Sequence, residues 1–208
     1  MTLRSPDHPY RNIPPSESAP IMANSNAITH TPALSLYPLI VGLLMGFIQS
    51  GLFFQLTFTL SSTYSTFLMV TICWLVGSAL GTLYLAKQDI RLNLFLGLAL
   101  AAYAACGALL LVAPFNTSLA PLYALLIVAT GFYPGVFFAR TAPYYRAHTL
   151  FSRENNGFIM GLVVATMLFM VAGRIVLWVL PVVTAAIVFY LESRLNWRDV
   201  ERPSDVKL

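Results

Sequence analysis

Few residues of this chain could do chemistry, and Glu154 is the first of them. It lies in the polar segment Ser152-Arg-Glu-Asn-Asn-Gly157, directly before an apolar stretch. A carboxylate at the start of a helix satisfies free backbone N–H groups and meets the positive end of the helix dipole, so capping is the favoured interpretation. The alternative is an ion pair with Arg140 or Arg146, which would form a gate or docking site at the inner mouth of a helix bundle.

Other candidate residues are polar or helix-bending groups inside apolar stretches. Gln49 and Gln55 are six residues apart and therefore do not share one helix face. Hydrogen bonding between helices is their favoured role, and solute binding is the alternative. Tyr133 and Pro134 occupy a site where the proline can kink a helix, and kinked helices often line cavities, although passive bundles contain them too.

No constellation typical of catalysis or metal binding occurs in the sequence. His8, His30 and His148 lack carboxylate or cysteine neighbours at ligand spacing. There is no phosphate-binding loop, dinucleotide-binding glycine motif or nucleophile elbow. We therefore expect no catalytic site, no cofactor and no metal. The basic residues fall in short separate groups without a continuous basic face, so nucleic acid is not an expected partner.

The stretches that must position these residues are those of a membrane protein. The chain is 58% hydrophobic and 10% charged, whereas soluble domains carry roughly 25% charged residues. This composition predicts an all-α, polytopic bundle of transmembrane helices in the lipid bilayer. Spans of about 20 residues suffice to cross the hydrocarbon layer, and we place them near residues 35–58, 64–86, 92–113, 119–139, 157–173 and 175–193.

Positive charges alternate between the gaps that separate these spans. Nearly all Lys and Arg residues fall in the two ends of the chain and in every second gap, including a longer link with Arg140, Arg146 and Arg153; Arg174 is the exception. Such residues are retained in the cytoplasm, which predicts that both termini are cytoplasmic. We expect a disordered tail over residues 1–34, the bundle over 35–193 with a tight turn at Gly173-Arg174, and a second tail over 194–208.

Glycines recur in pairs four residues apart on four of the predicted spans. Residues at this spacing share one helix face, and without side chains they let another backbone approach closely, which favours helix association in lipid. An ordinary compact bundle is the favoured interpretation, and the alternative is a divergent pair of three-helix units of opposite orientation, as in transporter halves. The pairs predicted to pack helices are Gly42/Gly46, Gly77/Gly81, Gly131/Gly135 and Gly157/Gly161.

The run from Phe47 to Leu85 resembles the first two helices of the membrane domain in spermidine-synthase-like bacterial membrane proteins. That family carries a Leu-x-Gly-x-Ala-Leu-Gly-Ser/Thr-like stretch, and here it reads Leu75-Val-Gly-Ser-Ala-Leu-Gly-Thr82. The segments 131–138 and 156–161 are loosely similar to later parts of the family. Members with aminopropyltransferase activity have a soluble catalytic domain, but only residues 194–208 follow the last span here, so no active-site residue carries over. The resemblance implies a stand-alone module of the bacterial inner membrane without enzymatic function.

Two functions remain open at this point. The favoured one is a non-catalytic membrane subunit that anchors or assembles a partner complex, with other membrane subunits or further copies of the chain as partners. The alternative is a small-solute permease or half-transporter that acts as an oligomer, which the glycine pairs, Tyr133-Pro134 and the two glutamines would serve. An enzyme active within the bilayer ranks last because the sequence supplies no acid, base or metal set.

Overall fold

The regular structure of the chain is helical throughout the part that the computed structural model describes, residues 32–60, 64–88 and 90–194. The six long helices are α1 (Pro32–Thr59), α2 (Tyr64–Leu83), α3 (Leu92–Val112), α4 (Ala120–Thr141), α5 (Ala147–Ala172) and α6 (Ile175–Arg194), and the short 3₁₀ helices are η1 (Leu85–Lys87), η2 (Thr117–Leu119) and η3 (Ala142–Tyr144). All six long helices are long and apolar enough to cross a membrane. The predicted all-α bundle is therefore confirmed, and the chain is a multi-pass membrane protein.

The bundle begins and ends close to the predicted residues 35 and 193, at Pro32 and Arg194. Helix α1 begins at Pro32, slightly before the predicted start at residue 35. The remainder of the predicted tails, residues 1–31 and 195–208, lies outside the described residues. The turn at Gly173-Arg174 is confirmed, because α5 ends at Ala172 and α6 begins at Ile175. Gly173 has φ 70°, a conformation that residues without a Cβ atom adopt readily.

Helix α5 begins ten residues earlier than the predicted fifth span, at Ala147 instead of residue 157. The predicted long link is therefore wrong: Arg140 lies in the last turn of α4 and Arg153 lies within α5. The prediction placed the start of the span where the hydropathy rises. The helix begins earlier, at the point where its buried face begins. The residues of that face recur every three or four positions from the first turns of the helix onward: Leu150, Glu154, Gly157, Gly161 and Ala165.

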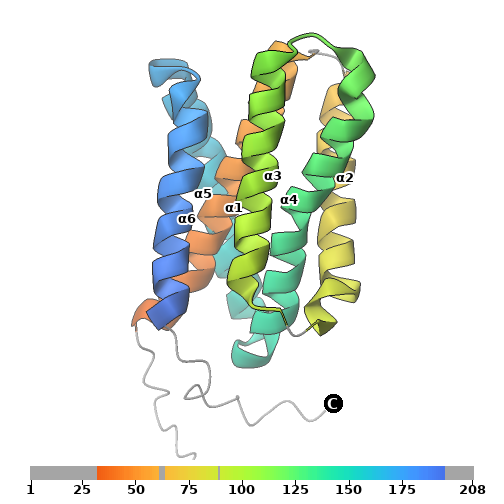
Figure 1. The fold of residues 1–208 in the computed structure, drawn as a ribbon. Coiled ribbons are helices and arrows are strands. Elements are labelled where there is room, and N and C mark those ends of the chain that lie inside the picture. The colour runs from red at the N-terminus through yellow and green to blue at the C-terminus, as the bar shows by residue number, and fades with distance from the viewer. Residues whose placement is uncertain (1–31, 61–63, 89, 195–208) are drawn as a thin grey trace, which may run out of the picture. The chain divides into compact units, whose positions relative to one another are not determined.

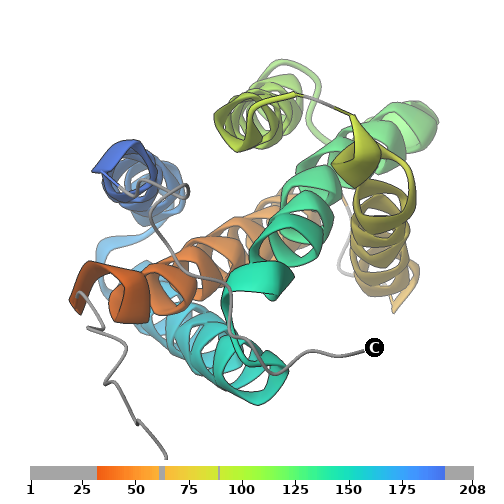
Figure 2. The same ribbon diagram turned by 90° about the horizontal axis from the view of Figure 1, so that it is seen from below.

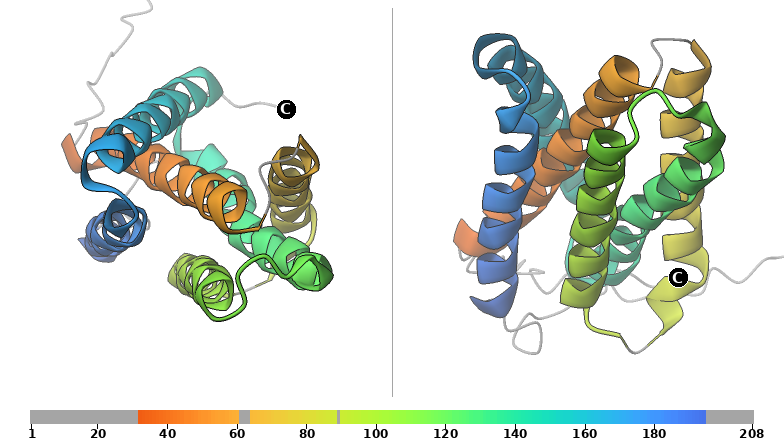
Figure 3. Two further views of the ribbon diagram at one scale, coloured as in Figure 1. Left: turned by 90° about the horizontal axis from the view of Figure 1, so that it is seen from above. Right: turned by 45° about the horizontal axis from the view of Figure 1, so that its top comes forward.

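The helices form two groups that can be followed in Figure 1. Helix α5 packs along α1 and helix α2 packs along α4, and these are the two most extensive contacts of the bundle. Helix α6 lies against α1, and α3 lies against α4. Viewed along the helices, α5 and α6 flank α1, while α2 and α3 flank α4 (Figures 2 and 3). The bundle thus consists of a group α1/α5/α6 and a group α2/α3/α4.

The two groups correspond to each other when the first three helices are matched with the last three. Exchanging α1 with α4, α2 with α5 and α3 with α6 reproduces the four main contacts, since α1·α5 becomes α4·α2 and α1·α6 becomes α4·α3. The chain reverses direction at each link (Figure 1), so the two three-helix halves start from opposite ends of the bundle. This pattern agrees with the alternative of two three-helix units of opposite orientation.

The four glycine pairs lie at the two most extensive contacts. Gly42 and Gly46 of α1 meet Gly157 and Gly161 of α5, and Gly77 and Gly81 of α2 meet Gly131 and Gly135 of α4. A Cβ atom added at Gly46 would lie 3.0 Å from the Cα atom of Gly161. One added at Gly77 would lie 2.9 Å from the Cα atom of Gly131. The backbones are in direct contact at both sites, which only glycine permits.

Candidate functional site

A pocket of about 310 Å³ lies where the two close helix contacts face each other. Its lining residues come from α1 and α5 on one side and from α2 and α4 on the other. The polar lining residues are Gln49, Thr71, Ser78, Glu154 and Asn155, and the apolar ones are Met45, Trp74, Leu75, Pro134, Phe138 and Phe158. Both glycine contacts bring these four helices close enough to share one pocket.

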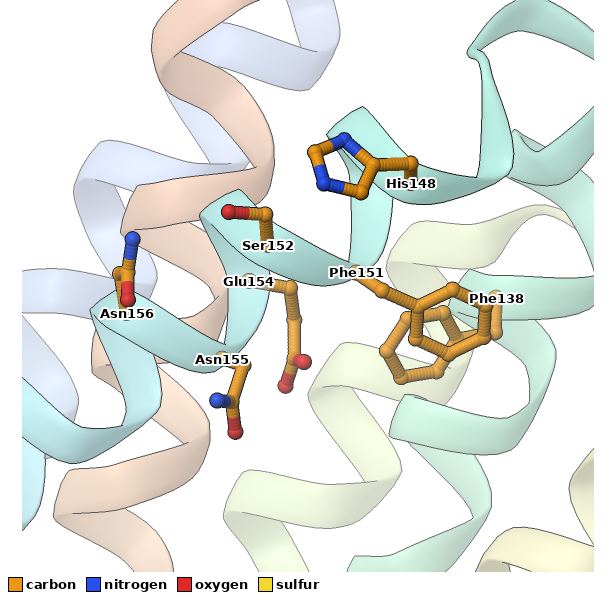
Figure 4. A pocket seen from close by; sticks show the side chains of 7 residues that line it. All are labelled: Phe138, His148, Phe151, Ser152, Glu154, Asn155 and Asn156. Carbon is orange, nitrogen blue, oxygen red and sulfur yellow. The ribbon is translucent and has the colours of Figure 1, made fainter.

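A second pocket of about 530 Å³ adjoins the first. The two share Phe138, Glu154 and Asn155, and the second extends to residues of the first turns of α5, including His148 and Ser152. Figure 4 shows Glu154 and Asn155 extending in the same direction from α5, beside the stacked rings of Phe138 and Phe151. Glu154 therefore lines both pockets, the second of which extends toward the start of α5.

Glu154 is a buried carboxylate in the third turn of α5. Only 9% of its surface is exposed, and it follows the first helical residue, Ala147, by seven positions. The capping role is therefore wrong, because the helix starts well before Glu154 and its first turn holds no acidic residue. Within the described part of the chain, no hydrogen bond or ion pair joins this carboxylate to another residue.

Arg140, the proposed partner of Glu154, is engaged elsewhere. Its guanidinium donates from Nη1 to the backbone oxygen of Ile90 and from Nη2 to that of Gln88, and it lies 6.0 Å from the centre of the Phe95 ring. Its charge acts on the carboxylate of Glu192 in α6. Arg140 thus links the end of α4 to the connection between η1 and α3 and to α6, and not to Glu154.

Glu192 is a half-buried acidic group that was not among the predicted site residues. With the amide of Asn93 turned so that its nitrogen faces the carboxylate, Asn93 donates to both oxygens of Glu192, at 2.6 and 3.1 Å. Two signals in the sequence could have revealed it. A carboxylate in the last turn of a helix opposes the helix dipole and needs a partner, and Glu192 continues the buried face formed by Ala185 and Val188.

The six predicted pathway residues divide between the pocket and the rest of the bundle. Gln49, Pro134 and Glu154 line the pocket. Gln55 donates from Nε2 to the hydroxyl of Tyr103 at 2.8 Å, and Tyr103 donates in turn to the backbone oxygen of Leu177. These bonds join α1, α3 and α6 away from the pocket. The two glutamines thus lie on different faces of α1.

Tyr133 and Arg140 also lie outside the pocket. Tyr133 is buried between α1 and α4, where its hydroxyl interacts with that of Tyr37. Conversely, Ser78 was not among the candidate residues, although it lines the pocket together with Trp74. A stripe on α2 at positions 71, 74 and 78 was the available signal, since these positions share one helix face.

The lining combines one carboxylate with amides, hydroxyls and aromatic rings. Such a set can hold a small solute by hydrogen bonds and charge, while apolar side chains surround the rest of it. Comparisons of the chain with protein-family models, with curated proteins and with solved structures found no match. The resemblance to spermidine-synthase-like membrane proteins therefore stays a prediction, and the function has to be inferred from the site.

Proposed function

We propose that this chain is a small-solute permease and that the pocket between α1, α2, α4 and α5 is its solute site. The observation that carries the proposal is Glu154, a carboxylate that is 9% exposed and has no partner among the described residues. Removing a charged group from water costs several kcal/mol, in order of magnitude, unless a partner compensates for it. A passive anchoring subunit gains nothing from such a group, whereas a solute site does.

The position of the pocket supports the same proposal. Transporters built from inverted repeats bind their solutes near the bilayer midplane, at the interface between the repeats. Both halves of this chain contribute two helices to the pocket. Gln49 lies near the middle of the span Leu36–Thr59, so the pocket reaches the depth at which such sites occur.

Orientation and location form part of the proposal. In the described residues, Lys87, Arg91, Arg140, Arg146, Arg153 and Arg194 belong to the end of the bundle at which α1 begins, and Arg174 belongs to the opposite end. The positive-inside rule makes the first end cytoplasmic. We place the protein in the bacterial inner membrane, in keeping with the family resemblance. We also propose that it acts as a homo-oligomer, because α2 and α5, which flank the pocket, bury the smallest share of their surface.

Cysteine accessibility tests the permease without knowledge of the solute. The native Cys73 and Cys106 are free thiols, so the experiment starts from a Cys73→Ser, Cys106→Ala background. Ser78→Cys then places one thiol in the pocket. A membrane-impermeant, positively charged methanethiosulfonate reagent is applied to right-side-out and to inverted vesicles. A permease exposes the pocket to each side in turn, so we expect Ser78→Cys to react from both sides.

Three control variants define the outcomes. Gln88→Cys should react only from the cytoplasmic side and Asn116→Cys only from the opposite side. Leu98→Cys on α3, which is exposed but outside the pocket, should resist the reagent because it faces lipid. Reaction of Ser78→Cys from one side only would reject the permease and favour the anchoring subunit. Reaction of Gln88→Cys from the outside would overturn the orientation.

A further inference from the structure

The charge of the pocket has one sign. Glu154 is the one ionisable carboxylate among the eleven residues that line the 310 Å³ pocket, and the lining contains no Lys, Arg or His. The other polar lining groups are the uncharged side chains of Gln49, Thr71, Ser78 and Asn155. An ionised Glu154 therefore creates a negative potential that the lining itself does not neutralise.

Two arginines of the described residues that lie near Glu154 in the sequence are engaged with other groups. Arg140 donates to the backbone oxygens of Gln88 and Ile90, and its charge also acts on Glu192. Arg153 directly precedes Glu154 in sequence but acts on Tyr145. Neither guanidinium therefore compensates the charge of Glu154, which leaves the carboxylate available to a positively charged solute.

The rest of the lining selects the kind of cation. Trp74, Phe138 and Phe158 present aromatic rings to the same pocket, and ring faces attract cations, Trp most strongly. A hard metal ion such as Ca²⁺ or Mg²⁺ requires six or more oxygen ligands, whereas most of this lining consists of carbon atoms and one carboxylate. An organic cation gains from both features, because its charge meets the carboxylate and its apolar groups meet the rings.

We infer that the pocket binds an organic ammonium ion, with Glu154 as its counter-ion and Trp74 as its main aromatic contact. The inference names the solute class of the permease and rests on that proposed function for the role of the pocket. A volume of about 310 Å³ is at the lower end of the range for small-molecule sites. It therefore suits a compact cation with one aromatic or several alkyl groups.

Binding is measured on the full-length chain in a neutral detergent by isothermal titration calorimetry. The probe is benzyltrimethylammonium, and benzyl alcohol and benzoate serve as neutral and anionic controls. Glu154→Gln keeps the shape of the side chain and removes the charge, and we expect it to weaken binding of the probe by about tenfold or more. Trp74→Leu should weaken binding by about threefold or more.

Glu192→Gln is the matched control variant, because Glu192 is another carboxylate that is partly withdrawn from the surface but lies outside the pocket, beside Asn93. It should leave the affinity within about twofold of the original chain. Thermal unfolding of every variant shows whether a loss of binding reflects a loss of folding. The inference is overturned if the original chain does not bind the probe, if either control compound binds as tightly, or if Glu154→Gln binds it unchanged.

The two proposals fail separately. If Ser78→Cys reacts from both sides of the membrane but the probe does not bind, the permease stands and the ammonium class is rejected. If the probe binds in a manner that depends on Glu154 but Ser78→Cys reacts from one side only, the ammonium site stands and transport is rejected.

Discussion

The close helix contacts predict that adding a single methyl group will destabilise the bundle at two separate places. A Cβ atom at Gly161 would lie 2.5 Å from the backbone oxygen of Leu43, and one at Gly81 would lie 2.5 Å from that of Phe132. Ordinary contact begins at 3.4 Å, so each helix pair would have to separate locally by about 0.9 Å. The obstructing atoms belong to the backbone and cannot turn aside as a side chain would.

We therefore expect Gly161→Ala and Gly81→Ala each to lower the free energy of unfolding by about 1–3 kcal/mol, the usual effect of overpacking. Gly97→Ala is the matched control. It lies on α3, and a Cβ atom there would meet nothing within 4 Å. Alanine also has the higher helix propensity, so this variant should be neutral or more stable by up to about 1 kcal/mol.

Thermal unfolding in a neutral detergent, followed by circular dichroism, measures these differences. For a chain of this size, about 1 kcal/mol corresponds to a change of roughly 2–4 °C in Tm. Gly161→Ala and Gly81→Ala should thus unfold several degrees below Gly97→Ala. If all three variants had the same Tm, the glycine pairs would not form the backbone contacts described, and the two-group arrangement would lose its main support.

Two further predictions concern the polar groups outside the pocket. Tyr103→Phe removes the hydroxyl that accepts a hydrogen bond from Gln55, a residue that is 2% exposed. The variant should be less stable by about 1–3 kcal/mol because the buried amide loses its partner. A Tm equal to that of the original chain would contradict this. Double-mutant cycles on Arg140, read by thermal stability, should give a coupling of at least about 0.5 kcal/mol with Glu192 and less than that with Glu154. The reverse order would restore the Arg140–Glu154 gate.

Most of the helical architecture could be predicted from composition alone. Six uncharged apolar stretches of about 20 residues leave little choice but six helices, because the bilayer offers no water to unpaired backbone groups. The start of α5 was missed for a physical reason. Hydropathy detects where a segment enters hydrocarbon, whereas the polar first turns of α5 are helical because Leu150 and Glu154 pack against the bundle. The spacing of these two residues was the better guide.

The candidate site was less predictable, because its chemistry depends on which helices meet. Gln49, Pro134 and Glu154 were recognised by residue type, but the sequence does not state that α1, α2, α4 and α5 share one pocket. An ion pair of Glu154 with Arg140 or Arg146 was predicted only as the alternative to capping, and no partner was predicted for Glu192. In the structure the charge of Arg140 acts on Glu192 instead, because α4 and α6 end at the same end of the bundle, where α3 begins. Contacts between residues so far apart in the sequence leave no recognisable pattern in any short stretch of it.

The kinds of contact within and between the two groups bear on how the pocket could change its access. Within the pairs α1/α5 and α2/α4 the contacts join backbone to backbone, so they cannot lengthen without losing their packing. Between α1 and α4 they join large side chains, such as Tyr37 and Phe137 with ring centres 5.7 Å apart, which can shift and turn. The group α1/α5/α6 should therefore move against the group α2/α3/α4 more easily than helices move against one another within either group. Since the pocket takes one wall from each group, movement along this boundary would open or close the site around Glu154 while both glycine contacts stay intact.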